Sequence, residues 1–198
     1  MLANARGVLF NEESEKAAQF IQLANRSHTP LVFLQNTTGY MVGKDYEQRG
    51  IIKDGAKMIN AVSNSRVPHL TIVMGASYGA GNYGMCGRAY GPRFLFSWPG
   101  AKSAVMGPAQ LAGVLSIVGR QSAEAKGQVY DEAGDAAMRE LVEAQIEAES
   151  LALANSGRVY DDGIIDPRDT RTVLGYCMGV VNRVPFSGVR GGFGVFRM

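Results

Sequence analysis

The sequence predicts an α/β fold built around a mainly parallel β-sheet. Short β-rich runs alternate with longer stretches whose apolar residues recur at helical spacing, which is typical of α/β proteins. The chain has 198 residues, of which 46% are hydrophobic and 19% charged, and this suits one folded domain. Its 25 glycines follow no collagen-like period, so they are expected to serve turns, close packing or backbone contacts to a ligand.

In the first half of the chain, apolar residues at helical spacing predict helices over residues 12–25 and 45–65. Brief apolar runs at residues 31–34 and 69–74 predict two buried strands, and turn-forming residues follow the first of them. Residues 75–91 form a glycine-dense turn that is expected to continue into a helix.

In the second half, residues 93–98 and 103–106 flank a Pro-Gly pair and predict two further strands. Helical periodicity predicts helices over residues 108–118 and 136–154, the second acidic along one face. Residues 169–181 form the last predicted element. Because the chain contains no internal repeat and no low-complexity linker, we expect a single domain over residues 1–198.

Composition argues against several classes of function. Cys86 and Cys177 are too few for a disulfide framework or a four-cysteine zinc site, and with only His28 and His69 beside them no metal centre is expected. A formal net charge of +2 gives no reason to expect nucleic acid as a partner. No charged-then-apolar leader opens the chain, and no apolar run approaches the roughly 18 residues that span a bilayer. We therefore expect no membrane partner and a cytoplasmic protein, or a protein of the mitochondrial matrix if the source is a eukaryote.

The most informative stretch is Gly-Ala-Ser-Tyr-Gly-Ala-Gly-Asn-Tyr-Gly at residues 75–84, where a predicted strand passes into a predicted helix. Its glycines at positions 79, 81 and 84 have the spacing of the dinucleotide-binding fingerprint. A dinucleotide site also needs an acidic residue about 20 positions further on, and no Asp or Glu lies between Gly55 and Ala123. This absence argues against a dinucleotide.

The same stretch suits a different ligand. A helix that begins directly after a strand presents unpaired N–H groups, and its dipole favours negative charge there. Small residues at Ala80 and Gly81 let a ligand oxygen approach those N–H groups, which could then stabilise a developing oxyanion. The alternative is that these glycines only allow a helix to pack tightly against a sheet, and the spacing alone leaves both interpretations open.

Basic residues are concentrated in the acid-free stretch. Six of them lie in residues 55–123, namely Lys57, Arg66, Arg88, Arg93, Lys102 and Arg120. If they gather in space they suit an anionic partner, and if they are scattered they are simply solvated. Among the remaining candidates, His69 is expected to be a surface or capping histidine. Cys86 is expected to be a small packing residue within the glycine-rich helix.

Several motifs together resemble the carboxyltransferase β subunit of biotin-dependent acyl-CoA carboxylases. The Gly-Ala-Gly-Asn-Tyr form at residues 79–83 is most similar to the 3-methylcrotonyl-CoA and geranyl-CoA branch. The motifs that carry the resemblance lie at residues 35–43, 50–58, 75–90, 92–99, 105–107, 161–167 and 193–198.

The resemblance implies a crotonase-like fold, a ββα superhelix, and identifies the chain as the C-terminal carboxyltransferase domain without its N-terminal counterpart. In this family the C-terminal domain receives carboxybiotin, and backbone N–H groups stabilise negative charge on the biotin. The resemblance assigns those N–H groups to Ala80 and Gly81. It places Gly39, Tyr40 and Gly79 at the biotin pocket.

The resemblance also places Tyr83 where the family has a residue that influences the choice of acyl group. It implies an N-terminal carboxyltransferase domain that binds acyl-CoA, biotin carried on a partner subunit, and a partner biotin carboxylase that uses ATP and bicarbonate. A homo-oligomer is expected. Because the N-terminal domain is missing, the isolated chain is expected to be inactive and to expose an apolar surface around Tyr40, Met41, Val42, Tyr83 and Met85.

Two other functions stay open. A crotonase-type acyl-CoA hydratase or isomerase would need a glutamate near the second loop or the helix start, and residues 76–100 contain none. A non-catalytic assembly domain would keep the fold and bind neither biotin nor CoA.

Overall fold

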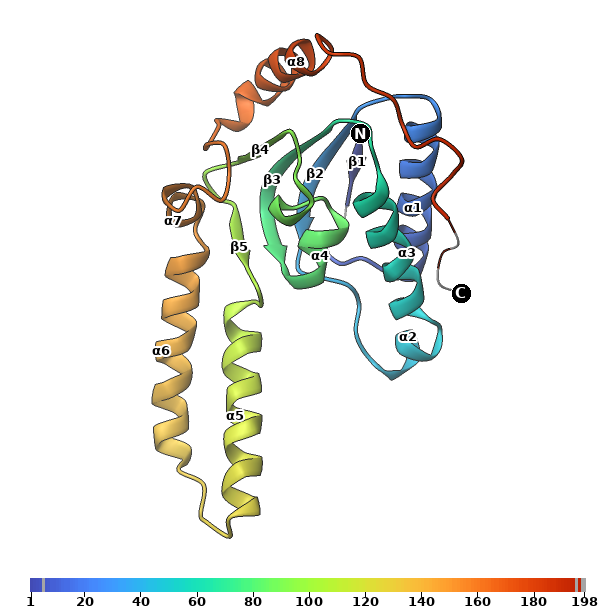
Figure 1. The fold of residues 1–198 in the computed structure, drawn as a ribbon. Coiled ribbons are helices and arrows are strands. Elements are labelled where there is room, and N and C mark those ends of the chain that lie inside the picture. Colours follow the sequence, from blue (N-terminus) through green and yellow to red (C-terminus); the bar gives the residue numbers. More distant parts are fainter. Residues whose placement is uncertain (5, 195, 197–198) are drawn as a thin grey trace.

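A computed structural model of the chain describes residues 1–4, 6–194 and 196. Its centre is a parallel sheet in the order β1-β2-β3-β4, with β5 paired to the far end of β3 (Figure 1). The strands are β1 (Leu2–Ala3), β2 (Leu31–Thr37), β3 (His69–Tyr78), β4 (Phe94–Ser97) and β5 (Lys102–Ala104). This confirms the predicted fold class. It also adds β1, which is only two residues long and therefore too short to be predicted from the sequence.

The helices form three groups. Helices α1 (Asn11–Arg26) and α3 (Ile51–Asn64) pack side by side on one face of the sheet, and short α2 (Lys44–Gln48) precedes α3 (Figure 1). On the opposite face, α8 (Thr170–Val181) packs through Cys177 against Val32 and Leu70. The elements that complete the fold are α4 (Gly79–Gly84), α5 (Pro108–Ala125), α6 (Glu132–Ser150), α7 (Ala152–Gly157) and the 3₁₀ turns η1 (Arg88–Tyr90) and η2 (Pro167–Asp169).

The main core lies between the sheet and the α1–α3 pair. Phe33 from β2, Ile21 from α1 and Met58 from α3 are fully buried there. Both faces of the central strands are covered, which explains why β2 and the start of β3 are nearly continuous apolar runs rather than alternating ones.

Several predicted boundaries were wrong. The helix predicted over residues 45–65 is two helices, because Gly50 adopts a left-handed conformation with φ of 91° and breaks it. Residues 75–78 were predicted as a turn but continue β3, where Ala76, Ser77 and Tyr78 pair with β5. The helix that follows is therefore only six residues long.

Helices α5 and α6 form an antiparallel hairpin that projects from the sheet (Figure 1). Helix α5 is longer than predicted, since it continues to Ala125. The helix predicted over residues 136–154 begins earlier, at Glu132, and ends at Ser150, after which α7 begins at Ala152. The Asp131 side chain caps α6 by accepting a hydrogen bond from the Gly134 N–H. Within the described part of the chain, no helix has both the length and the apolar composition to cross a bilayer.

Candidate functional site

The junction between β3 and α4 creates an uncapped helix start. Gly79 begins the helix with φ of 52°, and a Cβ atom at this position would lie 3.1 Å from the Val105 carbonyl oxygen. Both the backbone conformation and the limited space therefore favour glycine at this position. No side chain caps the first turn of α4 in the described structure, so its N–H groups stay available to a ligand.

The loop after β2 lies directly against this helix start. A Cβ atom at Gly81 would lie 2.8 Å from Thr37 Cγ2 and 3.0 Å from Gly39 Cα. The Thr37 hydroxyl holds the loop in place by accepting a hydrogen bond of 3.2 Å from the Gly39 N–H. The structure thus brings together Gly39 and Gly81, which are 42 positions apart in the sequence. Ala80 next to them is exposed.

The Tyr40 side chain points into the protein rather than toward a pocket. Its ring lies between α3 and α4, so that a Cβ atom at Gly55 would be 3.1 Å from Tyr40 Cε1 and one at Gly84 would meet the hydroxyl oxygen. Burial raises the pKa of this hydroxyl, which has no hydrogen-bond partner among the described residues. The predicted contribution of Tyr40 to a pocket wall is therefore restricted to its backbone.

A cavity of about 470 Å³ opens beside the start of α4. Three of the predicted site residues line it, namely Gly79, Ala80 and Tyr83. The Tyr83 ring is 46% exposed and packs edge-on against Tyr90, with 5.7 Å between ring centroids. Gly39, Tyr40 and Gly81 are not among the residues that line this cavity, and Gly81 lies against Thr37 and Gly39.

Sequence reasoning missed polar residues that line the same cavity. They are Ser77, Asn82, Ser97, Ser103, Asn155 and Asp161. Asn155 and Asp161 follow the α5–α6 hairpin in the sequence, so local patterns around the glycine motif could not reveal them. The only available signal was the motif at residues 161–167, whose first residue is Asp161.

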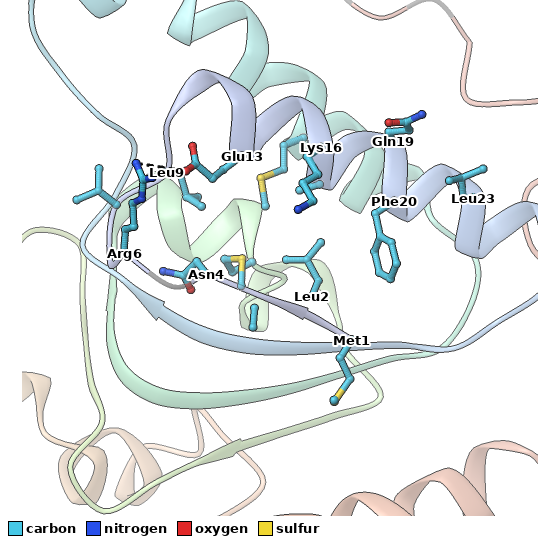
Figure 2. Close-up of a pocket in the computed structure, with 15 residues that line it drawn as sticks. Met1, Leu2, Asn4, Arg6, Leu9, Glu13, Lys16, Gln19, Phe20 and Leu23 are labelled. Carbon is cyan, nitrogen blue, oxygen red and sulfur yellow. Dashed lines mark ion pairs between the residues drawn. The ribbon is translucent and has the colours of Figure 1, made fainter.

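A second cavity, of about 560 Å³, lies between β1 and α1 (Figure 2). Leu2 from the strand and Phe20 from the helix approach each other across it, and an Arg6–Glu13 ion pair of 4.0 Å lies at one end. It contains none of the predicted site residues and does not reach the free N–H groups of α4. The glycine junction is therefore the stronger candidate site.

Four of the six basic residues in residues 55–123 form ion pairs in the folded chain. Lys57 forms ion pairs of 2.9 Å with Asp54 and Glu15, both outside the acid-free stretch. Three more of the six basic residues have acidic partners outside the acid-free stretch, in the pairs Arg88–Asp162, Lys102–Glu147 and Arg120–Glu132. The fold thus does not gather the six into a single uncompensated cationic patch.

The prediction that His69 lies on the surface or caps an element was wrong. His69 is 6% exposed, its Nε2 lies 2.7 Å from Ser65 Oγ, and its Nδ1 lies 3.3 Å from Cys86 Sγ. Burial lowers the pKa of His69 to about 4 and raises the pKa of Cys86 to about 12. Cys86 is a buried packing residue as predicted, although it follows α4 rather than lying in it.

Comparison with known proteins agrees with this geometry. Residues 1–185 match the carboxyl transferase domain family. The whole chain is 72% identical to 37% of a probable biotin-dependent acyl-coenzyme A carboxylase beta2 subunit from Mycobacterium tuberculosis. Among solved structures, the Pseudomonas aeruginosa geranyl-CoA carboxylase beta subunit is 45% identical with a TM-score of 0.84, over 96% of this chain and 36% of that one.

A more distant structure shares the same fold. Transcarboxylase 12S, described as a hexamer assembly, is 30% identical with a TM-score of 0.81, over 99% of this chain and 37% of that one. The chain therefore spans a little over a third of the length of these relatives. These matches confirm the crotonase-like fold that the motifs implied. The chain belongs to the carboxyl transferase domain family.

Proposed function

We propose that this chain is the carboxybiotin-binding, C-terminal domain of the carboxyltransferase of an acyl-CoA carboxylase. The observation that carries the proposal is the uncapped start of α4, which lies against the Gly39 loop and opens on the 470 Å³ cavity. The acyl substrate that we propose is 3-methylcrotonyl-CoA or a related branched acyl-CoA. The Gly-Ala-Gly-Asn-Tyr form at residues 79–83 and the 45% identity to geranyl-CoA carboxylase support this choice.

The residues at this site suit a ureido ligand. When bound, carboxybiotin supplies the carboxyl group that is transferred to the acyl-CoA. The N–H groups of Ala80 and Gly81 donate hydrogen bonds to the ureido oxygen and stabilise the negative charge that develops there, with the α4 dipole adding to the effect. Gly79 places no Cβ atom in the cavity, Gly39 lets the loop after β2 lie close to Gly81, and the exposed Tyr83 ring would contact the acyl group.

The proposal includes partners that the chain does not contain. An N-terminal carboxyltransferase domain would bind the acyl-CoA thioester, a carrier subunit would present biotin, and a biotin carboxylase would use ATP and bicarbonate to load it. The relative named as a biotin-dependent carboxylase beta subunit supports this division of roles. The cytoplasm, or the mitochondrial matrix in a eukaryote, stays the predicted compartment.

Titration of the full chain with d-biotin and, separately, with CoA tests the proposal. We expect saturable binding of d-biotin at the β3–α4 junction, seen as NMR shifts of the Ala80 and Gly81 amides, because these donors are preorganised for a carbonyl oxygen. Binding of CoA without biotin would favour a hydratase or isomerase instead. Binding of neither would favour an assembly domain.

The apolar surface lies elsewhere than predicted. Met85 is fully buried and the Tyr40 ring lies in the core, which leaves Val42 and Tyr83 as the exposed large side chains of the predicted patch. Four apolar residues of α5 are instead between 41% and 58% exposed, namely Val114, Leu115, Ile117 and Val118.

The four side chains are exposed because α5 packs against α6 through another face, on which polar groups form hydrogen bonds. Between α5 and α6, the Ser116 and Tyr130 hydroxyls donate hydrogen bonds of 2.6 and 2.7 Å to Asp135 Oδ1. Exposed contiguous apolar surface is typical of interaction sites. We propose that it packs against a second copy of this chain, a choice supported by the hexamer assembly of transcarboxylase 12S.

We expect the wild-type chain to self-associate and a Leu115→Glu variant to associate at least tenfold more weakly, because the substitution places a charge in an apolar contact. Light scattering coupled to size-exclusion chromatography measures the difference. Gln121→Glu adds the same charge to an exposed polar position of α5 and should leave association unchanged. A monomeric wild-type chain, or a Leu115→Glu variant that associates like wild type, would contradict the proposed interface.

A further inference from the structure

Asp161 leaves one carboxylate oxygen without a partner inside the candidate site. The residue lines the 470 Å³ cavity and is only 6% exposed. Its Oδ1 accepts a hydrogen bond of 3.1 Å from the Gly163 N–H, whereas its buried Oδ2 has no hydrogen-bond partner among the described residues. Buried polar atoms are normally paired, and an unpaired carboxylate oxygen is costly, so this atom needs an explanation.

The adjacent residues do not supply that partner. Asp162 is fully engaged, because its carboxylate accepts a hydrogen bond of 2.7 Å from the Leu95 N–H and forms an ion pair of 3.3 Å with Arg88. Arg88 lines the same cavity, and the ion pair engages its guanidinium with Asp162. The two neighbouring aspartates thus differ in role: Asp162 ties the loop to β4, and Asp161 keeps an acceptor oxygen without a partner among the described residues.

The cavity is therefore lined by hydrogen-bond donors and, through Asp161, by a residue with an unsatisfied acceptor. The first turn of α4, with Ala80, supplies free N–H donors. Ser77 lies beside it, and because its oxygen already accepts a hydrogen bond of 2.7 Å from Asn82 Nδ2, its own hydrogen is free to donate. A complementary ligand carries a carbonyl oxygen and an N–H group close together. A cyclic urea does so, whereas the thioester group of an acyl-CoA offers no N–H.

We infer that Asp161 is a ligand-binding residue whose free oxygen accepts a hydrogen bond from the ureido N–H of the biotin ring, on the nitrogen that does not carry the carboxyl group. This inference rests on the proposed function and extends it from the oxygen of the urea to its nitrogen. The N–H groups of α4 then bind the carbonyl oxygen of the ring, and the carboxylate of Asp161 binds its N–H group. Together the two contacts fix the orientation of the ring in the cavity. Asp161 also selects against carbonyl ligands without an adjacent N–H.

Binding measurements on the full chain by NMR titration test this role. Asp161→Asn replaces the acceptor by an amide that can offer a donor there, and we expect it to weaken d-biotin binding about ten- to hundredfold, the range for a hydrogen bond to a charged group. Asp169→Asn makes the same change at an exposed residue outside the cavity and should leave binding unchanged.

A pair of small ligands tests the same hydrogen bond without relying on a variant that must fold. The wild-type chain should bind 2-imidazolidinone more tightly than 1,3-dimethyl-2-imidazolidinone, which keeps the carbonyl oxygen and lacks both N–H groups. Asp161→Asn should abolish that preference.

The outcomes separate this inference from the proposed function. Equal binding of the two ureas by wild type, or unchanged d-biotin binding by Asp161→Asn, overturns the role of Asp161. If Ala80→Pro still weakens d-biotin binding in that case, the proposed function stands. Failure of the wild-type chain to bind d-biotin at all overturns both.

Discussion

Replacing Ala80 with proline is expected to lower the rate of carboxyl transfer by about 10²- to 10³-fold. The substitution removes one N–H donor at the start of α4, and loss of a single oxyanion donor costs this much in comparable sites. Proline is tolerated in the first turn of a helix, where the N–H groups have no intrahelical partner. The rate is measured in the carboxylase assembled from this domain, its acyl-CoA-binding counterpart and its biotin-carrying subunit.

Ala80→Gly is the matched control, because it keeps the N–H group and should retain most of the rate. Gly81→Pro is a poorer test, since any Cβ atom at that position meets Thr37 Cγ2 at 2.8 Å and disturbs packing at the same time. Far-UV circular dichroism and thermal unfolding verify that each variant is folded. A folded Ala80→Pro variant with near-normal turnover would contradict the assigned role of this amide.

The sequence was sufficient to predict the alternation of strands and helices and the strand-to-helix junction at the glycine motif. Both depend on local signals: apolar runs that must be buried, helical periodicity, and small residues where the chain turns. The same signals misplaced the boundary at residues 75–78. The pairing of β3 with β5 decides this segment, and that contact is made with residues more than 20 positions away.

The polar lining of the candidate site could not be predicted because tertiary structure assembles it. Ser77 and Ala80 lie near the glycine motif, whereas Asn155 and Asp161 arrive from beyond the α5–α6 hairpin. Tyr40 shows the converse difficulty. Its position in the loop after β2 was foreseen, but the gap left by Gly55 and Gly84, into which its ring packs, is a property of two other helices.

Buried His69 makes the chain sensitive to acid. Its environment consists of the Ser65 hydroxyl, the Cys86 thiol and the edge-on Phe33 ring, with 5.5 Å between ring centroids. Asn25 Nδ2 also donates to Ser65 Oγ, at 2.7 Å. These contacts include no carboxylate to stabilise a protonated imidazole, so burial lowers the pKa of His69 from 6.5 to about 4. Between pH 6.5 and about 4 the ring is therefore mostly neutral in the folded state, whereas it binds a proton in the unfolded chain.

The free energy of unfolding should consequently fall as the pH falls from 6.5 to 4, with His69 contributing a loss of about 3 kcal/mol. The unfolded state binds the extra proton in this range, and each pH unit then removes about 1.4 kcal/mol. Well above pH 6.5 both states are neutral at this residue and it adds no pH dependence. Urea unfolding followed by circular dichroism at pH 7, 6, 5 and 4 measures the effect.

His69→Gln should lose about 3 kcal/mol less than wild type over that range, whereas His28→Gln retains His69 and with it the acid sensitivity. Equal pH slopes for wild type and His69→Gln would show that the buried imidazole is not the group that senses acid.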